Sequence, residues 1–348
     1  MTYTILRGDA ADLPLDDDSV DLVVTSPPYF GLRSYKDGGE HYEGQIGAEA
    51  TPAEFIDNLT RCTREWMRVL KPSGSLWVNL GDKYNAYNGN RGRGTLQSNE
   101  PRQKQPSGAG LDVKTIKTKS LLGLPWRYAL ACIDEVGLIL RAEVVWSKPN
   151  GLPESVTDRV RRSHEQWFHF TVRPRYYCDL DPLRESHKYG GGLTWDERKE
   201  RGVLNVSGHT RGPQVENGGT PNTYFAAHPG GRIPGSVWSI PTQPLVVPPE
   251  LGVDHFAAFP MEWPRRMIRG WCPPGGVVLD PFGGTGTTAL VADVEGRHGI
   301  SVDLSADYCR LAEWRCADPK QRARAAGVKP AARARKEADA GGGQETLL

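Results

Sequence analysis

The sequence has no long apolar run. None of its hydrophobic stretches approaches the roughly 20 residues that a membrane-spanning helix needs. The first residues, MTYTILRGDAAD, also lack the basic-then-apolar pattern of a secretory signal. We therefore expect a cytoplasmic protein with no membrane partner.

Cysteine is scarce and dispersed along the 348 residues. No C-x-x-C pair occurs, so neither a zinc knuckle nor a disulfide framework is indicated. We expect reduced, mostly buried thiols and no metal site. The six cysteines are Cys62, Cys132, Cys178, Cys272, Cys309 and Cys316.

Net charge is small, at +1, and alone indicates no nucleic-acid partner. Its distribution is uneven, because residues 1–60 carry twelve acidic and three basic side chains while residues 83–119 carry eight basic and two acidic ones. The basic stretch is rich in Gly, Asn and Ser, so it reads either as a loop that follows a phosphate backbone or as a solvated insertion. On the first reading, its DNA contacts are Arg91, Arg93, Lys114 and Lys117.

The alternation of short apolar runs with amphipathic stretches predicts one large α/β domain. Regular pattern fades over residues 179–236, which predicts an insertion, and residues 319–348 alternate Ala with Lys and Arg, which predicts a largely disordered or weakly helical tail. Strands are predicted at residues 3–10, 19–25, 75–82, 138–150, 165–172, 276–280 and 298–304, the fourth and fifth as a hairpin at the sheet edge.

Helices are predicted near residues 52–70, 125–137, 255–272, 287–296 and 306–316. The first has clear boundaries: Thr51 caps it, Glu54 completes a capping box, and Gly74 is expected to end it.

The stretch TSPPY, Thr25 to Tyr29, directly follows a predicted buried strand. Pro27 and Pro28 cannot donate to a sheet ladder, so the strand must end there and the backbone stays stiff. Ser26 Oγ and the carbonyls of Ser26 and Pro27 can accept hydrogen bonds, and Tyr29 offers a flat face beside them. Such a corner suits an amino group on a planar ring, although Pro-Pro after a strand is also found as a plain rigid exit.

The stretch VVLDPFGGTGTT, residues 277–288, combines a strand, a glycine turn and a helix start. Its glycines permit close approach to the backbone, and Asp303 ends the next strand, where a carboxylate can accept both hydroxyls of a ribose. No Lys follows the glycines, which argues against a P-loop. The combination predicts a nucleoside-type cofactor.

TSPPY followed far downstream by DPFGGTGTT resembles the amino-DNA methyltransferases, which methylate exocyclic amino groups of cytosine or adenine with S-adenosylmethionine. The resemblance covers roughly residues 3–178 and 237–315. Because the catalytic motif precedes the cofactor motif, it points to the circularly permuted β group. It implies a Rossmann-like S-adenosylmethionine-dependent methyltransferase sheet, circularly permuted: residues 1–178 would be the catalytic part, 237–318 the cofactor-binding part, and the inserted region 179–236 would recognise the target sequence.

The resemblance also implies site residues. Ser26, Pro27, Pro28 and Tyr29 would be catalytic. The alternatives are that Asp9 serves only as a turn cap and His255 only as a packed surface residue. Lys148 and Asn150 would line the target-base pocket and contact DNA. The cofactor would be bound by Asp9, Thr25, His255, Phe259, Asp280, Phe282, Gly284, Gly286, Thr287 and Asp303.

The favoured activity is methyl transfer to N4 of a cytosine flipped out of double-stranded DNA, because Ser before Pro-Pro goes mostly with cytosine in the resembling enzymes. Transfer to adenine N6 is the alternative, and a catalytically idle DNA-binding protein on the same scaffold is the second. A cognate restriction endonuclease and a homodimer are further expected partners.

Overall fold

The computed structural model describes residues 2–31, 45–85, 116–186, 230–253 and 258–328, and the backbone of two short strands between residues 36 and 41. The chain divides into two compact units, residues 1–178 with 236–348 and residues 179–235. In the part of the smaller unit that is described, Glu185 and Arg232 join two segments through paired backbone hydrogen bonds of 2.9 Å and an ion pair. Within the described ranges, no helix is both long and apolar enough to cross a membrane.

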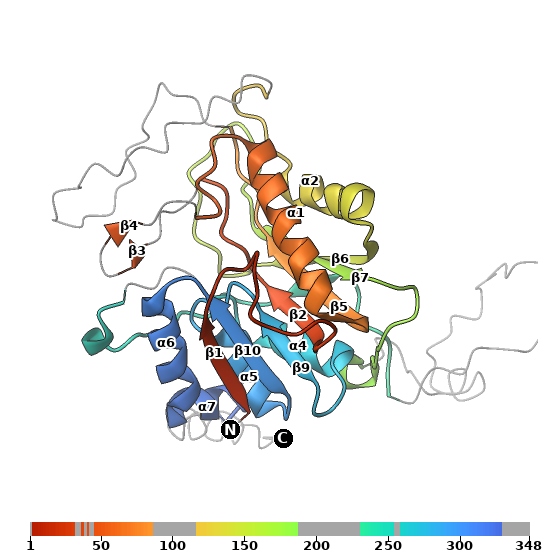
Figure 1. Ribbon diagram of the computed structural model, residues 1–348. Helices are drawn as coiled ribbons and strands as arrows, with labels where there is room; N and C mark the ends of the chain where they lie inside the picture. Colours follow the sequence, from red (N-terminus) through yellow and green to blue (C-terminus); the bar gives the residue numbers. More distant parts are fainter. Residues whose placement is uncertain are drawn as a thin grey trace, which may run out of the picture. The chain divides into compact units, whose positions relative to one another are not determined.

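The larger unit contains a sheet with the strand order β1-β10-β9-β2-β5-β7-β6-β8. β1, β10, β9, β2 and β5 run parallel, whereas β7 is antiparallel to both β5 and β6. β1 and β10 lie side by side in Figure 1. The bounds are β1 Tyr3–Arg7, β2 Val20–Thr25, β5 Leu70–Leu80, β6 Ile139–Ser147, β7 His164–Thr171, β8 Val237–Ser239, β9 Val277–Asp280 and β10 His298–Asp303, with a separate pair of β3 Lys36–Asp37 and β4 Glu40–His41.

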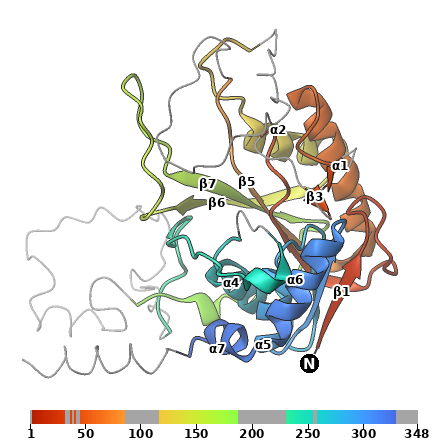
Figure 2. The same ribbon diagram turned by 90° about the vertical axis from the view of Figure 1, so that its left-hand side faces the viewer.

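Helices cover both faces of this sheet. α1 and α2 lie on one face, and α4, α5 and α6 lie on the other (Figure 2). The bounds are α1 Pro52–Val69, α2 Leu124–Ala131, α4 Glu262–Trp271, α5 Thr287–Val294, α6 Ala306–Ala317 and α7 Pro319–Ala325, with short turns η1 Cys132–Val136, η2 Asp181–Leu183 and η3 Pro249–Leu251.

The predicted capping box of α1 is confirmed: the Thr51 hydroxyl accepts from the Glu54 amide at 3.2 Å, and the Glu54 carboxylate accepts from the Thr51 amide at 3.0 Å. The predicted end at Gly74 is wrong. α1 ends at Val69, and β5 begins at Leu70, which pairs with Val20 ahead of a register shift. Gly74 instead lies inside β5, where an added Cβ would be 2.5 Å from a Leu70 methyl carbon.

Three other expectations change. The β6–β7 hairpin is not at the sheet edge, because β8 pairs with β6 beyond it. The predicted helix 255–272 begins at Glu262 in the structure. Residues 319–325 form helix α7, capped by Asp318, where we expected disorder or weak helix; the buried Ala325 explains this, because packing stabilises a short helix. Residues 329–348 lie outside the described part.

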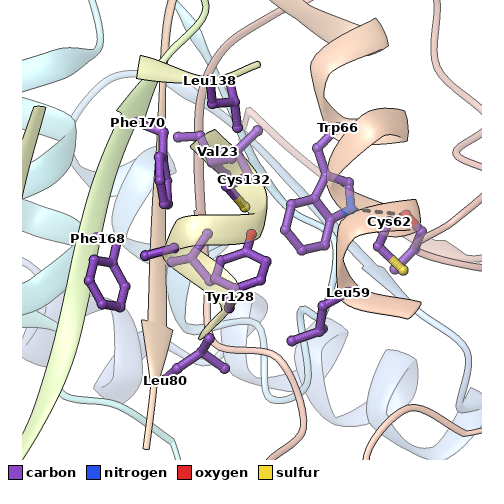
Figure 3. Packing of buried hydrophobic residues seen from close by; sticks show 14 of the residues in the cluster. Val23, Leu59, Cys62, Trp66, Leu80, Tyr128, Cys132, Leu138, Phe168 and Phe170 are labelled. Atoms are coloured by element: carbon purple, nitrogen blue, oxygen red, sulfur yellow. Dashed lines mark hydrogen bonds between the residues drawn. The ribbon is translucent and has the colours of Figure 1, made fainter. Parts of the chain in front are cut away.

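The core under α1 and α2 is aromatic and tightly partnered. Figure 3 shows Tyr128 of α2 between Trp66 of α1 and Phe170 of β7. The Tyr128 hydroxyl hydrogen-bonds the Thr63 hydroxyl at 2.8 Å, and the Trp66 indole N–H donates to the Ala10 carbonyl at 2.9 Å. The buried polar atoms of these rings are thus satisfied, which fixes α1 against the loop after β1.

All six cysteines are unpaired, and four of them are buried. Burial raises the pKa of Cys62 and Cys132 to about 12, and has the same effect on Cys272 and Cys316. These thiols therefore stay protonated and serve as small apolar side chains.

On the other face, tryptophans stack between the sheet and α4. Trp263 of α4 is fully buried, with ring centroids 5.0 Å from Trp167 and 5.1 Å from Trp238. This contact attaches α4 to β7 and β8.

We expect Trp263→Ala to reduce the free energy of unfolding by about 3–5 kcal/mol, because a large cavity would replace a fully packed ring. Urea denaturation measures this loss. Trp126→Ala is the matched control, since Trp126 is 42% exposed and should lose clearly less. Equal losses for the two variants would contradict a structural role for the tryptophan stack.

Candidate active site

The polar segments singled out in the sequence meet at one edge of the sheet. Residues 25–29 leave β2, residues 280–286 leave β9, and Asp303 ends β10. These strands are parallel, so their carboxyl ends share one edge. Ligands of open α/β sheets bind beyond this edge. It is therefore the candidate active site.

Ser26 is oriented by a buried asparagine. Its hydroxyl donates to Asn79 Oδ1 at 3.2 Å, and Asn79 is 1% exposed. Asn79 Nδ2 in turn donates to the Gln166 carbonyl at 3.0 Å, which fixes the direction of its amide. Because the hydroxyl proton points to Asn79, the lone pairs of Ser26 are left to accept hydrogen bonds.

Tyr29 is held at both ends of its side chain. Its hydroxyl lies 2.8 Å from Asn79 Oδ1 and 2.8 Å from Glu165 Oε2. Its ring lies against Gly81, where an added Cβ would be 2.6 Å from the ring. Glu165 also accepts a hydrogen bond from Lys148 Nζ, which lies 4.1 Å from the centroid of the Trp146 ring. The Tyr29 side chain is thus held by Asn79 of β5, by Gly81 directly after β5, and by Glu165 of β7.

The glycine turn after β9 is tied to the end of β10. Asp303 Oδ2 accepts from the Gly284 amide and Oδ1 from the Ser305 amide, both at 2.9 Å. Gly286 adopts a φ of +70°, and a Cβ there would lie 2.8 Å from the Ala312 Cβ of α6. Glycine is required at this position both for its backbone conformation and for the close approach of α5 to α6.

Asp280 is the buried acid at the start of this turn. It accepts hydrogen bonds from the Thr288 hydroxyl at 2.8 Å and from the Phe282 amide at 3.2 Å. Burial raises the pKa of Asp280 to about 6 and the nearby Asp303 adds to this, whereas the Thr25 and Thr288 hydroxyls and the Phe282 amide oppose it. The predicted residue Thr25 is thus buried beside Asp280.

Phe282 and Asp9 lie near the loop after β1. The Phe282 ring packs edge-on against Trp66, with centroids 5.8 Å apart. The Trp66 indole N–H donates a hydrogen bond to the Ala10 carbonyl. Asp9 is exposed and its Oδ1 accepts from the Ala11 amide at 2.9 Å, the contact of a turn cap. Asp9 thus caps the turn with one of its two carboxylate oxygens, Oδ1. A role of Asp9 in cofactor binding stays a prediction.

Other predicted residues have partners inside the protein. The Thr287 hydroxyl lies 2.7 Å from the guanidinium of Arg315, a buried cation whose pKa burial lowers to about 10. Asn150 exchanges two hydrogen bonds with the backbone of Thr242, at 2.8 and 3.2 Å. The Phe259 ring packs edge-on against Trp167 at 5.7 Å.

Of the basic stretch 83–119, the structure describes residues 83–85 and 116–119. Lys117 is exposed there. Four predicted residues lie outside the described residues, and their roles stay predictions: Arg91, Arg93, Lys114 and His255.

Asn79, Gly81 and Glu165 are the residues that the sequence reasoning missed. A signal existed for Asn79, because an amide inside the apolar run of a central strand must find partners. Gly81 follows directly in the same run. Glu165 had no local signal, since its contact to Tyr29 spans 136 positions.

Comparisons with known proteins agree with this geometry. A family model described as DNA methylase, of the N6/N4 type, matches residues 20–313. The chain belongs to this DNA methylase family. The type II methyltransferase M.XycI of Xanthomonas campestris pv. cyanopsidis is 37% identical over 89% of this chain and 86% of its own length. M.SmaI of Serratia marcescens is 34% identical over 89% of both chains.

A solved structure with the same fold is that of the PvuII DNA methyltransferase (cytosine-N4-specific). It has a TM-score of 0.59 and 20% identity, and the alignment covers 94% of both chains. The predicted methyltransferase sheet and the resemblance to amino-DNA methyltransferases are thus confirmed.

We expect Asn79→Ala to slow DNA methylation by roughly tenfold to a hundredfold, because Ser26 and the Tyr29 hydroxyl would lose a shared acceptor and shift. Single-turnover rates measure the effect. Ser19→Ala is the control, since Ser19 precedes the amino end of β2, opposite the site, and its hydroxyl bonds the Asp16 carbonyl. A wild-type rate for Asn79→Ala would show that Ser26 and Tyr29 keep their positions without Asn79.

Proposed function

We propose that this DNA methylase transfers a methyl group from S-adenosylmethionine to N4 of a cytosine in double-stranded DNA. The observation that carries the proposal is the orientation of Ser26 by Asn79 at the carboxyl end of β2. It leaves a neutral acceptor beside the stiff Pro27-Pro28 backbone.

The glycine turn fits the cofactor. At Gly284, with φ +50°, the nearest atom to an added Cβ is a carbonyl oxygen 3.9 Å away, so there is room to approach the turn. Asp280 and Asp303 supply carboxylates for a cation and for ribose hydroxyls, and Phe282 supplies an apolar wall. Bound S-adenosylmethionine supplies an electrophilic methyl group on a positively charged sulfur.

The acceptors beside Pro27 address the chemical difficulty of the reaction. An aryl amino nitrogen is a poor nucleophile because its lone pair is delocalised into the ring. Ser26 Oγ and the Pro27 carbonyl can accept from its two hydrogens, which favours a pyramidal nitrogen with an available lone pair. No charged base is needed at this position, and a preorganised pair of acceptors loses nothing to reorganisation.

Tyr29 is suited to receive the flipped base. Flipping costs a few kcal/mol, and stacking on an aromatic face returns part of it. The contacts with Asn79, Gly81 and Glu165 fix the ring before the base arrives. Pro28 keeps the chain stiff between the ring and the acceptors.

The choice of cytosine over adenine rests on Ser26 and on the resemblance described above. Adenine N6 is the alternative, because both targets present an amino group on an aromatic ring. The type II designation of M.XycI and M.SmaI supports a role opposite a cognate restriction endonuclease. We further propose that residues 179–236 read the target sequence, and a homodimer stays a prediction.

We expect DNA from a methylation-free host that expresses the gene to contain N4-methylcytosine. Mass spectrometry of nucleosides identifies the base, and long-read sequencing gives its sequence context. The Ser26→Ala variant should contain much less of the product. N6-methyladenine without N4-methylcytosine would contradict the choice of base, and neither product would favour the idle DNA-binding protein.

We expect the affinity for S-adenosylmethionine to fall as the pH is lowered through about 6, because protonation of Asp280 removes a carboxylate facing a cation. The slope should approach tenfold per pH unit below this pKa. Calorimetric titrations between about pH 5 and 8 test this, since the drop lies around the raised pKa. Asp280→Asn should bind weakly without the drop, and Glu313→Gln, an exposed acid on α6, should keep it.

The stability of the free protein should change in the opposite direction. The raised pKa means that the native state binds the Asp280 proton more tightly than the unfolded state, so this contribution to stability is full at low pH and is lost as pH rises through about 6.

For the binding titrations, a pH-independent affinity of the wild type for S-adenosylmethionine would remove Asp280 from the cofactor site.

A further inference from the structure

The loop between β6 and β7, residues 148–163, begins and ends next to residues that contact the Tyr29 side chain. The Lys148 amide donates to the Ser163 carbonyl at 2.8 Å and closes the base of the loop. Lys148 and Glu165, on either side of this closure, form the ion pair that reaches the Tyr29 hydroxyl. Figure 2 shows the loop, in yellow-green, projecting beyond the ends of the two strands.

Internal hydrogen bonds brace this loop. The Glu154 carboxylate binds the Arg159 guanidinium at 3.0 Å and the Arg162 amide at 3.1 Å, and the Arg159 hydrogen bond lowers the pKa of Glu154. The Arg161 guanidinium donates to the Gly151 carbonyl at 3.4 Å, which joins the two arms nearer the base. The loop therefore has a defined conformation.

The same loop is attached to the segment that follows β5. Arg162 forms an ion pair with the nearly buried Asp82 at 3.5 Å, and the Arg159 guanidinium lies 3.9 Å from the centroid of the Tyr84 ring. Because Gly81, which precedes Asp82, contacts the Tyr29 ring, these contacts place the loop near that ring.

This braced loop exposes apolar side chains. Leu152 is 90% exposed and Val160 is 86% exposed, the highest values for large apolar side chains in the described residues. Each is next in sequence to one partner of the Gly151–Arg161 contact, and Pro153 beside Leu152 is also exposed. Scattered single apolar residues are ordinary on surfaces. Two such side chains on one braced loop near the Tyr29 ring call for a functional explanation.

We propose that Leu152 and Val160 form a wedge that enters the DNA base stack next to the flipped base. The inference rests on the proposed function, because only a flipped base leaves a gap to fill. Apolar side chains, Leu and Pro among them, open base steps in other DNA complexes. The exposed Arg161 beside the wedge offers a cation to the phosphates. The contacts that join the base of the loop to Tyr29, the residue proposed to stack on the flipped base, favour DNA over a protein partner.

The test compares wild type with the Leu152→Ala/Val160→Ala double variant on two duplexes that contain the mapped methylation site. One duplex is fully matched, and the other carries a mismatch at the target base, which lowers the energy needed to flip it. We expect the variant to lose about tenfold or more in kcat/KM on the matched duplex, and to come within about threefold of wild type on the mismatched one. Affinity for S-adenosylmethionine should not change.

Val328→Ala is the matched control, since Val328 is 61% exposed and follows α7. It should behave as wild type on both duplexes. Light scattering of wild type and the double variant adds a readout for a protein partner.

Each other outcome overturns the proposal. Wild-type kcat/KM of the double variant on the matched duplex would show that no wedge acts there. An equal loss on both duplexes would indicate a contact that does not assist flipping. Dissociation of a wild-type dimer in the double variant would assign the loop to self-association. A wild-type protein that methylates no DNA would overturn the proposed function first, and the wedge with it.

Discussion

The parallel pairing of β2 with β9 is the contact on which the site depends. Leu22 and Val23 pair with Val278 and Leu279, joining strands more than 250 positions apart. A side chain secures each end of the pair: Asp21 Oδ2 accepts from the Val277 amide at 2.8 Å, and the Thr288 hydroxyl lies 3.4 Å from the Val24 carbonyl. Only this pairing puts the acceptors after β2 beside the glycine turn after β9, because the two segments are otherwise unconnected in sequence.

A second constraint comes from buried polar groups. Asn79 lies in the buried part of β5, residues 74–80, and an unsatisfied amide there would cost roughly 1–3 kcal/mol. Its satisfaction requires Gln166 on one side and the Ser26 and Tyr29 hydroxyls on the other. Folding energetics and catalytic geometry therefore require the same contacts. Moving Ser26 or Tyr29 would leave the buried Asn79 amide without partners, so their positions are fixed before the reaction. Fixed positions reduce reorganisation during the reaction.

The predictability of the elements follows the range of the interactions that form them. The capping box at Thr51 and Glu54 and the glycine turn before α5 depend on neighbours in sequence. Both could therefore be predicted from the local residues. The start of β5 at Leu70 could not be predicted, because pairing with Val20 overrides the helical pattern. The addition of β8 beyond β6 depends on three residues after a long insertion. Glu165 could be linked to Tyr29 only once β7 was placed beside β5.

Lys148 and Asn150 already have partners inside the protein, and their predicted DNA contacts stay predictions. The resemblance implied that both line the target-base pocket and contact DNA, and both follow β6 at the edge of the sheet where the site lies. Lys148 is paired with Glu165, and Asn150 bonds the backbone at Thr242. Side chains with such partners set the shape of a pocket, because moving them would break existing bonds before any new bond forms. Groups that the fold leaves facing solvent can take a new partner without breaking such bonds. In the loop between β6 and β7, residues 148–163, such solvent-facing side chains lie on segments that the contacts of Glu154 and Arg162 hold in place.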